Sequence, residues 1–223
     1  KILENGDLWI GAATAFSHIT NDPTIQKLVP MLGEAVDMVG GPQIRNTGTI
    51  GGNICNGATS ADSAASMCTF NELIQLEFYT GPGRTVRDRC EVCTGFIIKK
   101  EDYEGWYGQY IKYGKRKAME IATLGCAVRV KLSADKKMIE DVRLGYGVAG
   151  PTPLRCHAAE TYLKGKTVSD KEAAAEFARL ALTEVNPRSS WRASKEFRLQ
   201  LIEELAKRGL AEAIRRAGGE ENA

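Results

Sequence analysis

The stretch with the clearest chemical potential is rich in glycine and small polar residues. It reads Gln43-Ile44-Arg45-Asn46-Thr47-Gly48-Thr49-Ile50-Gly51-Gly52-Asn53-Ile54-Cys55-Asn56-Gly57. Paired glycines let the backbone approach a ligand closely because no Cβ intervenes. Successive N–H groups in such a loop can form a concave anion site that suits a pyrophosphate. Thr49 and Asn53 can add side-chain hydrogen bonds, and Asp62, further along, could accept one from a sugar hydroxyl.

The pattern by itself leaves two interpretations open. It is neither the G-x-G-x-x-G of dinucleotide-binding folds nor a phosphate loop that ends in G-K-S or G-K-T, so a structural turn competes with a phosphate cradle. Lys112, just before Lys115 and Arg116, is a second candidate. Its cation could face a phosphate or a flavin ring edge, or it could belong to a solvated basic turn. No nucleophile–base pair stands out, which fits a protein whose cofactor supplies the chemistry.

The six cysteines do not form a disulfide framework in a chain of 223 residues. They indicate a reducing, cytoplasmic compartment. Cys90 and Cys93 have the C-x-x-C spacing of metal ligands, but no second pair at matching spacing follows. Two half-buried thiols near a strand are therefore the simpler interpretation of this pair.

The composition is that of an ordinary globular protein with one large or two small domains. Hydrophobic residues make up 43% and charged residues 26% of the chain. The formal net charge of +2 is too small to favour nucleic acid or an anionic membrane as the main partner. No apolar run approaches the roughly 18 residues that span a bilayer, and the first residues have no signal-peptide character.

The elements that must position these residues follow from periodicity and capping signals. The expected elements of the first half are a strand at 8–13, a helix that Asp22 caps and that begins at Pro23, and a strand at 73–78. Pro30 should kink or split the helix, and Gly40-Gly41-Pro42 should end it.

The second half predicts a β-meander followed by two helices. Strands at 124–132 and 138–148 flank a turn at 133–137. Ser169 and Glu172 have the spacing of a capping box for the first helix. The last helix should begin at about Ser194, turn Phe197, Leu201, Leu205 and Ile214 inward, and end at Gly218-Gly219. Strands followed by helices indicate an α+β unit, with a domain boundary in the aromatic, glycine-rich segment 105–114.

The segment from Gly41 to Ser63 resembles the second FAD-binding segment of the FAD-binding (medium) subunits of the molybdenum hydroxylase family, in particular those of bacterial xanthine dehydrogenases. The resemblance continues at 79–83, 111–121, 147–153 and 187–198. Separate motifs in the same order therefore cover the chain nearly end to end, and they make chance similarity a poor explanation.

The resemblance implies a fold and a cofactor site. Residues 1–107 would be an FAD-binding domain of the vanillyl-alcohol-oxidase (PCMH) type, and residues 108–223 an α+β C-terminal domain of the CO dehydrogenase flavoprotein type. By the same resemblance, Asp62 takes the acidic position on the cofactor, and Lys112 is the lysine near the flavin. Cys93, or Val92 beside it, falls where the family has an apolar residue against FAD. The pyrophosphate would be held by Thr49, Ile50, Gly51, Gly52 and Asn53.

The resemblance also implies electron transfer within a complex. A large molybdopterin-binding subunit would hydroxylate a purine or related heterocycle, and 2Fe-2S clusters on a small subunit would pass electrons to FAD and on to NAD or another acceptor. The alternative is a cofactor-free structural or assembly subunit, in which the segment 191–198 is a docking surface and not merely a helix entrance. Family members also have a further N-terminal lobe with a glycine-rich segment, and a longer connection after Phe78. Either this sequence leaves out these residues of the protein, which is our expectation, or the protein is a truncated relative.

Overall fold

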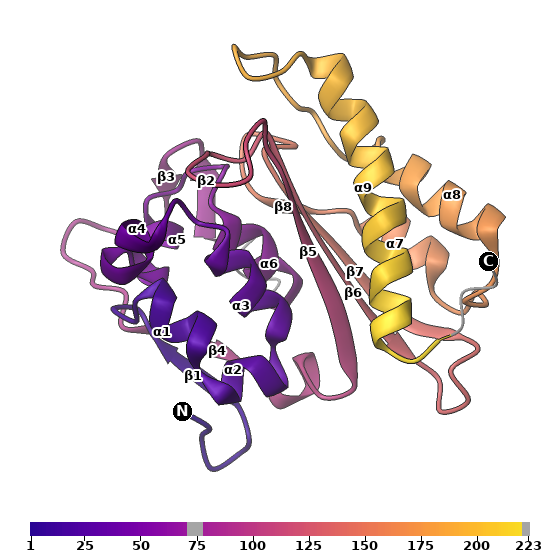
Figure 1. The fold of residues 1–223 in the computed structure, drawn as a ribbon, viewed down its shortest axis with the longest axis horizontal. Helices are drawn as coiled ribbons and strands as arrows, with labels where there is room; N and C mark the ends of the chain where they lie inside the picture. Colours follow the sequence, from indigo (N-terminus) through magenta and orange to yellow (C-terminus); the bar gives the residue numbers. More distant parts are fainter. Residues whose placement is uncertain (71–77, 220–223) are drawn as a thin grey trace.

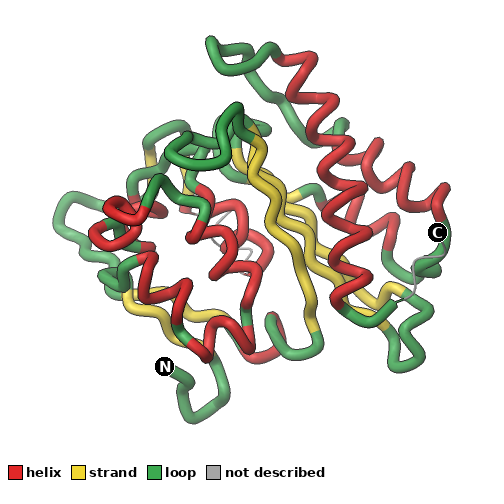
Figure 2. Tube along the Cα trace, viewed as in Figure 1, coloured by secondary structure: helices red, strands yellow, loops and turns green. Residues whose placement is uncertain are grey.

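Within residues 1–70 and 78–219, which the computed structural model describes, a four-stranded antiparallel sheet stands between two groups of helices (Figure 1). The strands follow chain order: β5 (Trp106–Tyr113), β6 (Leu124–Leu132), β7 (Ile139–Gly147) and β8 (Leu154–Arg155). Helices that precede the sheet in the chain lie on one side of it, and helices that follow it lie on the other (Figure 2). The α+β class predicted from the sequence is confirmed.

The predicted β-meander is confirmed. β6 and β7 pair antiparallel, from Gly125 opposite Gly147 to Leu132 opposite Ile139. β5 pairs with the other edge of β6 and places Lys112 opposite Gly125. Most of the segment 105–114, in which the sequence predicts a domain boundary, therefore belongs to strand β5. The boundary between residues 107 and 108 stays a prediction.

The helix that the sequence predicts at Pro23 begins where its capping signal places it. The Asp22 carboxylate accepts hydrogen bonds from the N–H groups of Thr24 (2.8 Å) and Ile25 (3.1 Å), and α2 (Pro23–Leu28) starts there. Pro30 splits the predicted helix, because α3 (Pro30–Asp37) starts at this proline as a separate helix.

Two short antiparallel strand pairs accompany these helices. The predicted first strand is β1 (Leu8–Gly11), which pairs with β4 (Gly95–Ile98). Residues 73–77 of the strand predicted to end at Phe78 lie outside the described residues. The remaining elements of this half are α1 (Phe16–Asn21), α4 (Pro42–Thr47), β2 (Tyr79–Gly81), β3 (Arg84–Thr85) and the 3-10 turn η2 (Lys100–Asp102).

The glycine-rich stretch forms α4 and a second short helix, and not the loop that its composition predicts. α5 (Ile50–Cys55) follows Thr49, whose hydroxyl accepts a hydrogen bond from the Gly52 N–H at 3.1 Å. Gly51 allows close packing against the end of β1, since a Cβ there would lie 2.6 Å from the Cβ of Ala12. Capping and tight packing thus offset the low helix propensity of glycine.

Three helices follow the meander in the described residues, where the sequence predicts two. The sequence misses α7 (His157–Leu163), which has no side-chain cap at Cys156 to mark its start. It predicts α8 (Lys171–Ala181) but places the cap wrongly on Ser169. The N-cap is Asp170, because its carboxylate lies closer to the helix start and accepts a hydrogen bond from the Ala173 N–H at 2.8 Å.

The last helix, α9 (Lys195–Arg216), confirms its predicted cap at Ser194, which accepts a hydrogen bond from the Phe197 N–H. Leu201, Leu205 and Ile214 are buried as predicted. The inward prediction for Phe197 is wrong, since this side chain is 38% exposed. The first turn of α9 lies at the end of β5, where Phe197 packs edge-on against Tyr113.

The central sheet has two buried faces, which we name after the helices that cover them. On the α9 face, β6 presents Leu124, Cys126, Val128, Val130 and Leu132 to one hydrophobic core. On the α6 face, Gly125, Ala127 and Arg129 of the same strand point toward α3 and α6 (Asp62–Phe70). None of the helices in the described ranges combines the length and the apolar character needed to cross a membrane.

Candidate functional site

A buried carboxylate and two side chains of β5 form the centre of the site. Asp62, the first residue of α6, is 5% exposed. Its Oδ1 accepts a hydrogen bond from the Tyr110 hydroxyl at 2.6 Å, and its Oδ2 forms an ion pair with Lys112 Nζ at 2.8 Å. Tyr110 and Lys112 are two positions apart on one strand, so both point to the α6 face.

The Lys112 ammonium retains donor capacity. It donates to Asp62 and to the Met38 carbonyl oxygen, both at 2.8 Å. A protonated lysine has three N–H donors. The described part of the chain gives the third no partner, so one N–H remains for a ligand.

The electrostatics of this cluster follow from burial. Burial raises the pKa of the Asp62 carboxyl, while the Lys112 charge and the hydrogen bonds from Lys112 and Tyr110 lower it. Burial, together with the Asp62 charge, raises the pKa of the Tyr110 phenol well above its usual value. Tyr110 is therefore a neutral donor. The paired Lys112 cation is the charge that stabilises Asp62 as a carboxylate.

The ion pair lines a cavity of about 340 Å³ between α5, α6 and β5. Asn53, which also lines the cavity, accepts a hydrogen bond on its side-chain oxygen from the Ser63 hydroxyl at 2.7 Å. This bond leaves the Asn53 amide N–H groups as donors toward the cavity. The other lining residues are Val39, Gly40, Ile44, Ala58, Ser60, Ala61, Met119, Glu120 and Ile121. The structure thus brings together Asn53, Asp62 and Lys112 of the predicted site.

The other predicted residues of the glycine stretch precede Asn53 in α5. Their N–H groups already donate within the protein: Ile50 to Thr14, Gly51 to Ala12, Gly52 to the Thr49 hydroxyl and Asn53 to the Thr49 carbonyl. The Thr49 hydroxyl is the one side-chain acceptor in this set, so its rotation would release the Gly52 N–H. A Cβ at Gly52 would meet only Thr49 Oγ1, at 3.0 Å, which leaves the space beside Gly52 open to a ligand.

Cys93 lies elsewhere, at the C-terminal end of α5. Its thiol is within hydrogen-bonding reach of the Cys55 thiol, and burial with this neighbour raises the pKa of Cys55 to about 11. Cys93 is half-buried and Cys90 is exposed. Cys93 is not among the residues that line the cavity beside Lys112.

Sequence reasoning missed Tyr110, which contacts Asp62 directly. The signal was available, because Tyr110 precedes Lys112 by two positions in a strand and must share its face. Nothing in the sequence indicated that the Met38 carbonyl oxygen accepts a hydrogen bond from Lys112, since only the packing of α3 against β5 brings the two groups together.

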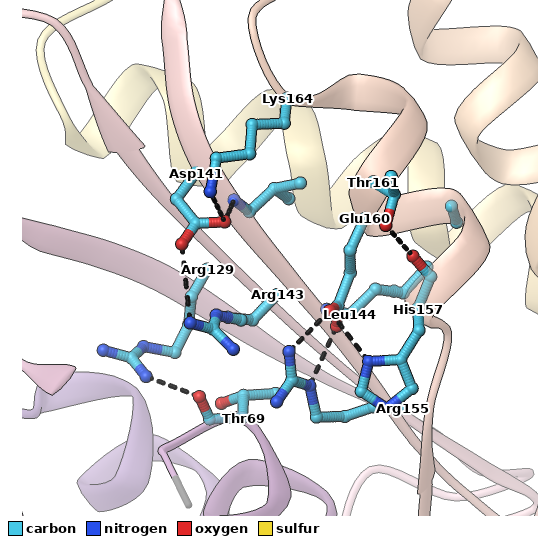
Figure 3. Close-up of polar contacts among 12 residues, drawn as sticks. Thr69, Arg129, Asp141, Arg143, Leu144, Arg155, His157, Glu160, Thr161 and Lys164 are labelled. Atoms are coloured by element: carbon cyan, nitrogen blue, oxygen red, sulfur yellow. Dashed lines mark hydrogen bonds and ion pairs between the residues drawn. The ribbon is translucent and has the colours of Figure 1, made fainter. Parts of the chain in front are cut away.

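A second cluster of buried charges lies between β7, β8 and α7 (Figure 3). The Glu160 carboxylate accepts hydrogen bonds from the Leu144 N–H at 2.8 Å and from Arg155 Nε at 2.9 Å. The carboxylate is therefore occupied by groups of the protein itself. This cluster joins α7 to the sheet and has the character of a structural junction, in contrast to the cavity at Lys112.

Two family models match the chain in succession. The FAD binding domain in molybdopterin dehydrogenase matches residues 3–98, and the CO dehydrogenase flavoprotein C-terminal domain matches residues 109–213. A xanthine dehydrogenase FAD-binding subunit of Escherichia coli is 39% identical over 98% of this chain and 78% of its own length. The carbon monoxide dehydrogenase medium chain of Hydrogenophaga pseudoflava is 28% identical over 93% of this chain and 75% of its own.

A solved structure agrees with these matches. Carbon monoxide dehydrogenase from Hydrogenophaga pseudoflava, in a form that lacks the Mo-pyranopterin moiety, superposes with a TM-score of 0.87 at 27% identity. The match covers 96% of this chain and 77% of that chain. The fold and the matched domains thus define a flavoprotein in which an FAD-binding domain precedes a CO dehydrogenase-type C-terminal domain.

The chain belongs to the family of FAD-binding subunits of the molybdenum hydroxylases and is of the xanthine dehydrogenase-like type. Its homologues are subunits of oxidoreductases. The predictions of family, fold, cofactor and enzyme class are confirmed.

Proposed function

We propose that the chain transfers electrons through FAD, from 2Fe-2S clusters on a small partner subunit to NAD. A large molybdopterin-binding subunit would supply those electrons by hydroxylating its substrate. FAD suits this position because a flavin accepts single electrons and releases a hydride. The cavity at the Asp62–Lys112 pair carries the proposal, since it offers a fixed cation and amide donors beside the glycine stretch.

The residues present fit part of an FAD molecule. A volume of about 340 Å³ lies at the lower end of the roughly 300–1,000 Å³ usual for ligand sites. In our proposal, Thr49, Gly52 and Asn53 bind the pyrophosphate region, with Ile50 and Gly51 fixing the turn of α5 against β1. Asp62 and Lys112 would then contact the remainder of the cofactor.

The role predicted for Cys93 changes in this proposal. Cys93 contacts Cys55 at the far end of α5, so it would border the cofactor region and not line the cavity. A cytoplasmic location would suit both the free thiols of all six cysteines and an exchange of electrons with NAD.

The first test is the visible absorption spectrum of the purified chain, with the released cofactor identified by mass. We expect stoichiometric FAD. Asn53→Ala should remove most of the flavin and leave the far-UV circular dichroism unchanged, because the Asn53 side chain faces the cavity. Asn56→Ala, an exposed asparagine that follows the same helix, is the matched control and should retain FAD. A colourless chain that FAD cannot reconstitute would favour the cofactor-free assembly subunit.

The acceptor and the partners need separate measurements. Anaerobic NADH should bleach the flavin absorbance of the holoprotein if NAD is the acceptor. A holoprotein that NADH leaves oxidised would exclude NAD and favour another acceptor. Affinity purification from the native cell should yield two further polypeptides, one with molybdopterin and one with iron and sulfide. Purification of the chain alone would contradict the proposed complex.

A further inference from the structure

The Tyr110 hydroxyl has a position that packing alone does not explain. Tyr110 is 1% exposed and belongs to the hydrophobic core on the α6 face. A phenylalanine would fill the same space without bringing a polar atom into that core. A buried hydroxyl costs free energy unless it is hydrogen-bonded, and its partner here is the Asp62 carboxylate at 2.6 Å.

Gly125 provides the space for this hydroxyl. It lies opposite Lys112 in the β5–β6 register, so a side chain at position 125 would project on the same face as Tyr110 and Lys112. A Cβ at Gly125 would lie 2.5 Å from the Tyr110 hydroxyl oxygen, but 3.4 Å and 3.5 Å from the nearest ring carbons. The absence of a side chain at position 125 therefore accommodates the hydroxyl in particular and not the ring.

The two oxygens of Asp62 have separate partners. Tyr110 holds Oδ1, and Lys112 pairs with Oδ2. The hydrogen bond at Oδ1 restrains rotation of the carboxylate, and Oδ2 pairs with the ammonium of Lys112 beside the cavity. Glu120 also lines the cavity, but its carboxylate accepts a hydrogen bond from the Arg116 N–H and belongs to its own loop.

We propose that Tyr110 is a positioning residue of the cofactor site: through Asp62 it orients Lys112 toward FAD, and Gly125 is the glycine that permits this contact. The proposal rests on the proposed function, because it assigns Lys112 to the FAD site. Tyr110 itself contacts Asp62, and its effect on the cofactor is transmitted by that carboxylate.

The test is a double-mutant cycle on the FAD dissociation constant of the purified full chain, measured by flavin fluorescence after removal of FAD. Tyr110→Phe should weaken FAD binding about tenfold, the order expected for one lost hydrogen bond to a charged group. In an Asp62→Ala background, Tyr110→Phe should have little further effect, because the acceptor through which it acts is gone. Tyr107→Phe, an exposed tyrosine of the same strand, is the matched control.

The Gly125 contact supplies an independent readout. Gly125→Ala should lower the melting temperature of the chain and weaken FAD binding as Tyr110→Phe does. In the Tyr110→Phe background, Gly125→Ala should leave the melting temperature nearly unchanged, since the remaining contacts at 3.4 Å and 3.5 Å are ordinary.

The outcomes separate this inference from the proposed function. A wild-type chain that does not bind FAD would overturn the proposed function and this inference with it. A chain that binds FAD but shows equal effects of Tyr110→Phe in the wild-type and in the Asp62→Ala background would overturn the inference alone. The same holds if Gly125→Ala costs as much stability without the Tyr110 hydroxyl as with it.

Discussion

The two faces of the central sheet are both buried, yet they are built from different chemistry. On the α9 face, leucine, valine and tyrosine side chains fill the space between the strands and the helices. On the α6 face, the intervening positions of the same strands carry glycine, alanine and arginine. The carbonyl oxygen of Thr69, in α6, accepts a hydrogen bond from Arg129 of β6 at 2.8 Å.

The two faces also differ in where the glycines lie. On the α9 face a glycine of the helix receives a strand side chain, since a Cβ at Gly209 would lie 2.6 Å from Val128 Cγ2, whereas on the other face glycines of the strands let the backbone of α6 approach. A Cβ at Gly145 would lie 2.8 Å from the carbonyl oxygen of Ala65. This close approach brings Asp62, at the start of α6, to Tyr110 and Lys112. The α9 face thus contributes mainly stability, and the α6 face contributes the candidate ligand site.

The largest expected loss comes from the α9 face. Leu144 is fully buried in the core of that face, so Leu144→Ala should lower the free energy of unfolding by about 3–5 kcal/mol through lost burial and a cavity. Urea denaturation measures this loss. FAD affinity should change little, because Leu144 points away from the cavity. A loss below about 1 kcal/mol would mean that the core repacks and that this face is less specific than its contacts suggest.

Lys112→Met tests the α6 face by leaving the buried Asp62 carboxylate without its cation. We expect about 3 kcal/mol less stability, in the range for breaking a buried ion pair, together with loss of FAD. Adding Asp62→Asn to the same chain should recover most of the stability but not the FAD binding. Lys117→Met, at an exposed lysine, should change neither quantity. If the double variant stays as unstable as Lys112→Met, the pair is not the source of the loss.

Gly145→Ala, next to Leu144 in the chain, tests the close approach of α6. Its Cβ would lie 2.8 Å from Ala65 O and 2.9 Å from Thr69 Cγ2, so α6 must shift away from β7. We expect a loss of about 1–2 kcal/mol, typical of overpacking, with weaker FAD binding because Asp62 moves with α6. Glu140→Ala, at an exposed position of the same strand, is the control. Unchanged stability would show that the contact between α6 and the sheet accommodates an added methyl group.

The smallest expected effect is a dependence of stability on pH. Burial raises the pKa of Asp62 above its usual value of 3.8. Between the unfolded and the folded pKa the folded state binds more protons, so the free energy of unfolding falls as pH rises through that window. Asp62→Asn should remove the contribution of Asp62 to this decrease in the free energy of unfolding. Urea denaturation from about pH 4 to about pH 7 compares the two chains, and identical slopes would contradict the raised pKa.

The sequence predicted the elements whose signals are local. Asp22 with Pro23, Pro30 and Ser194 act through neighbouring backbone groups, and the structure has helix boundaries at each of them. The strand segments at 124–132 and 138–148, with the turn between them, predicted the meander. Local signals failed at α5, where packing on Ala12 overrides the glycine composition, and at Phe197, whose helical spacing is correct but whose turn lies at the end of the sheet.

The candidate site divides in the same way. The sequence by itself determined the residue types of the site and the family, because composition and motif order are properties of the chain alone. Only the tertiary structure decided that Asp62 pairs with Lys112 and that Cys93 contacts Cys55. Those contacts join residues far apart in sequence, and they depend on how closely a helix of small residues can pack against the glycines of a sheet.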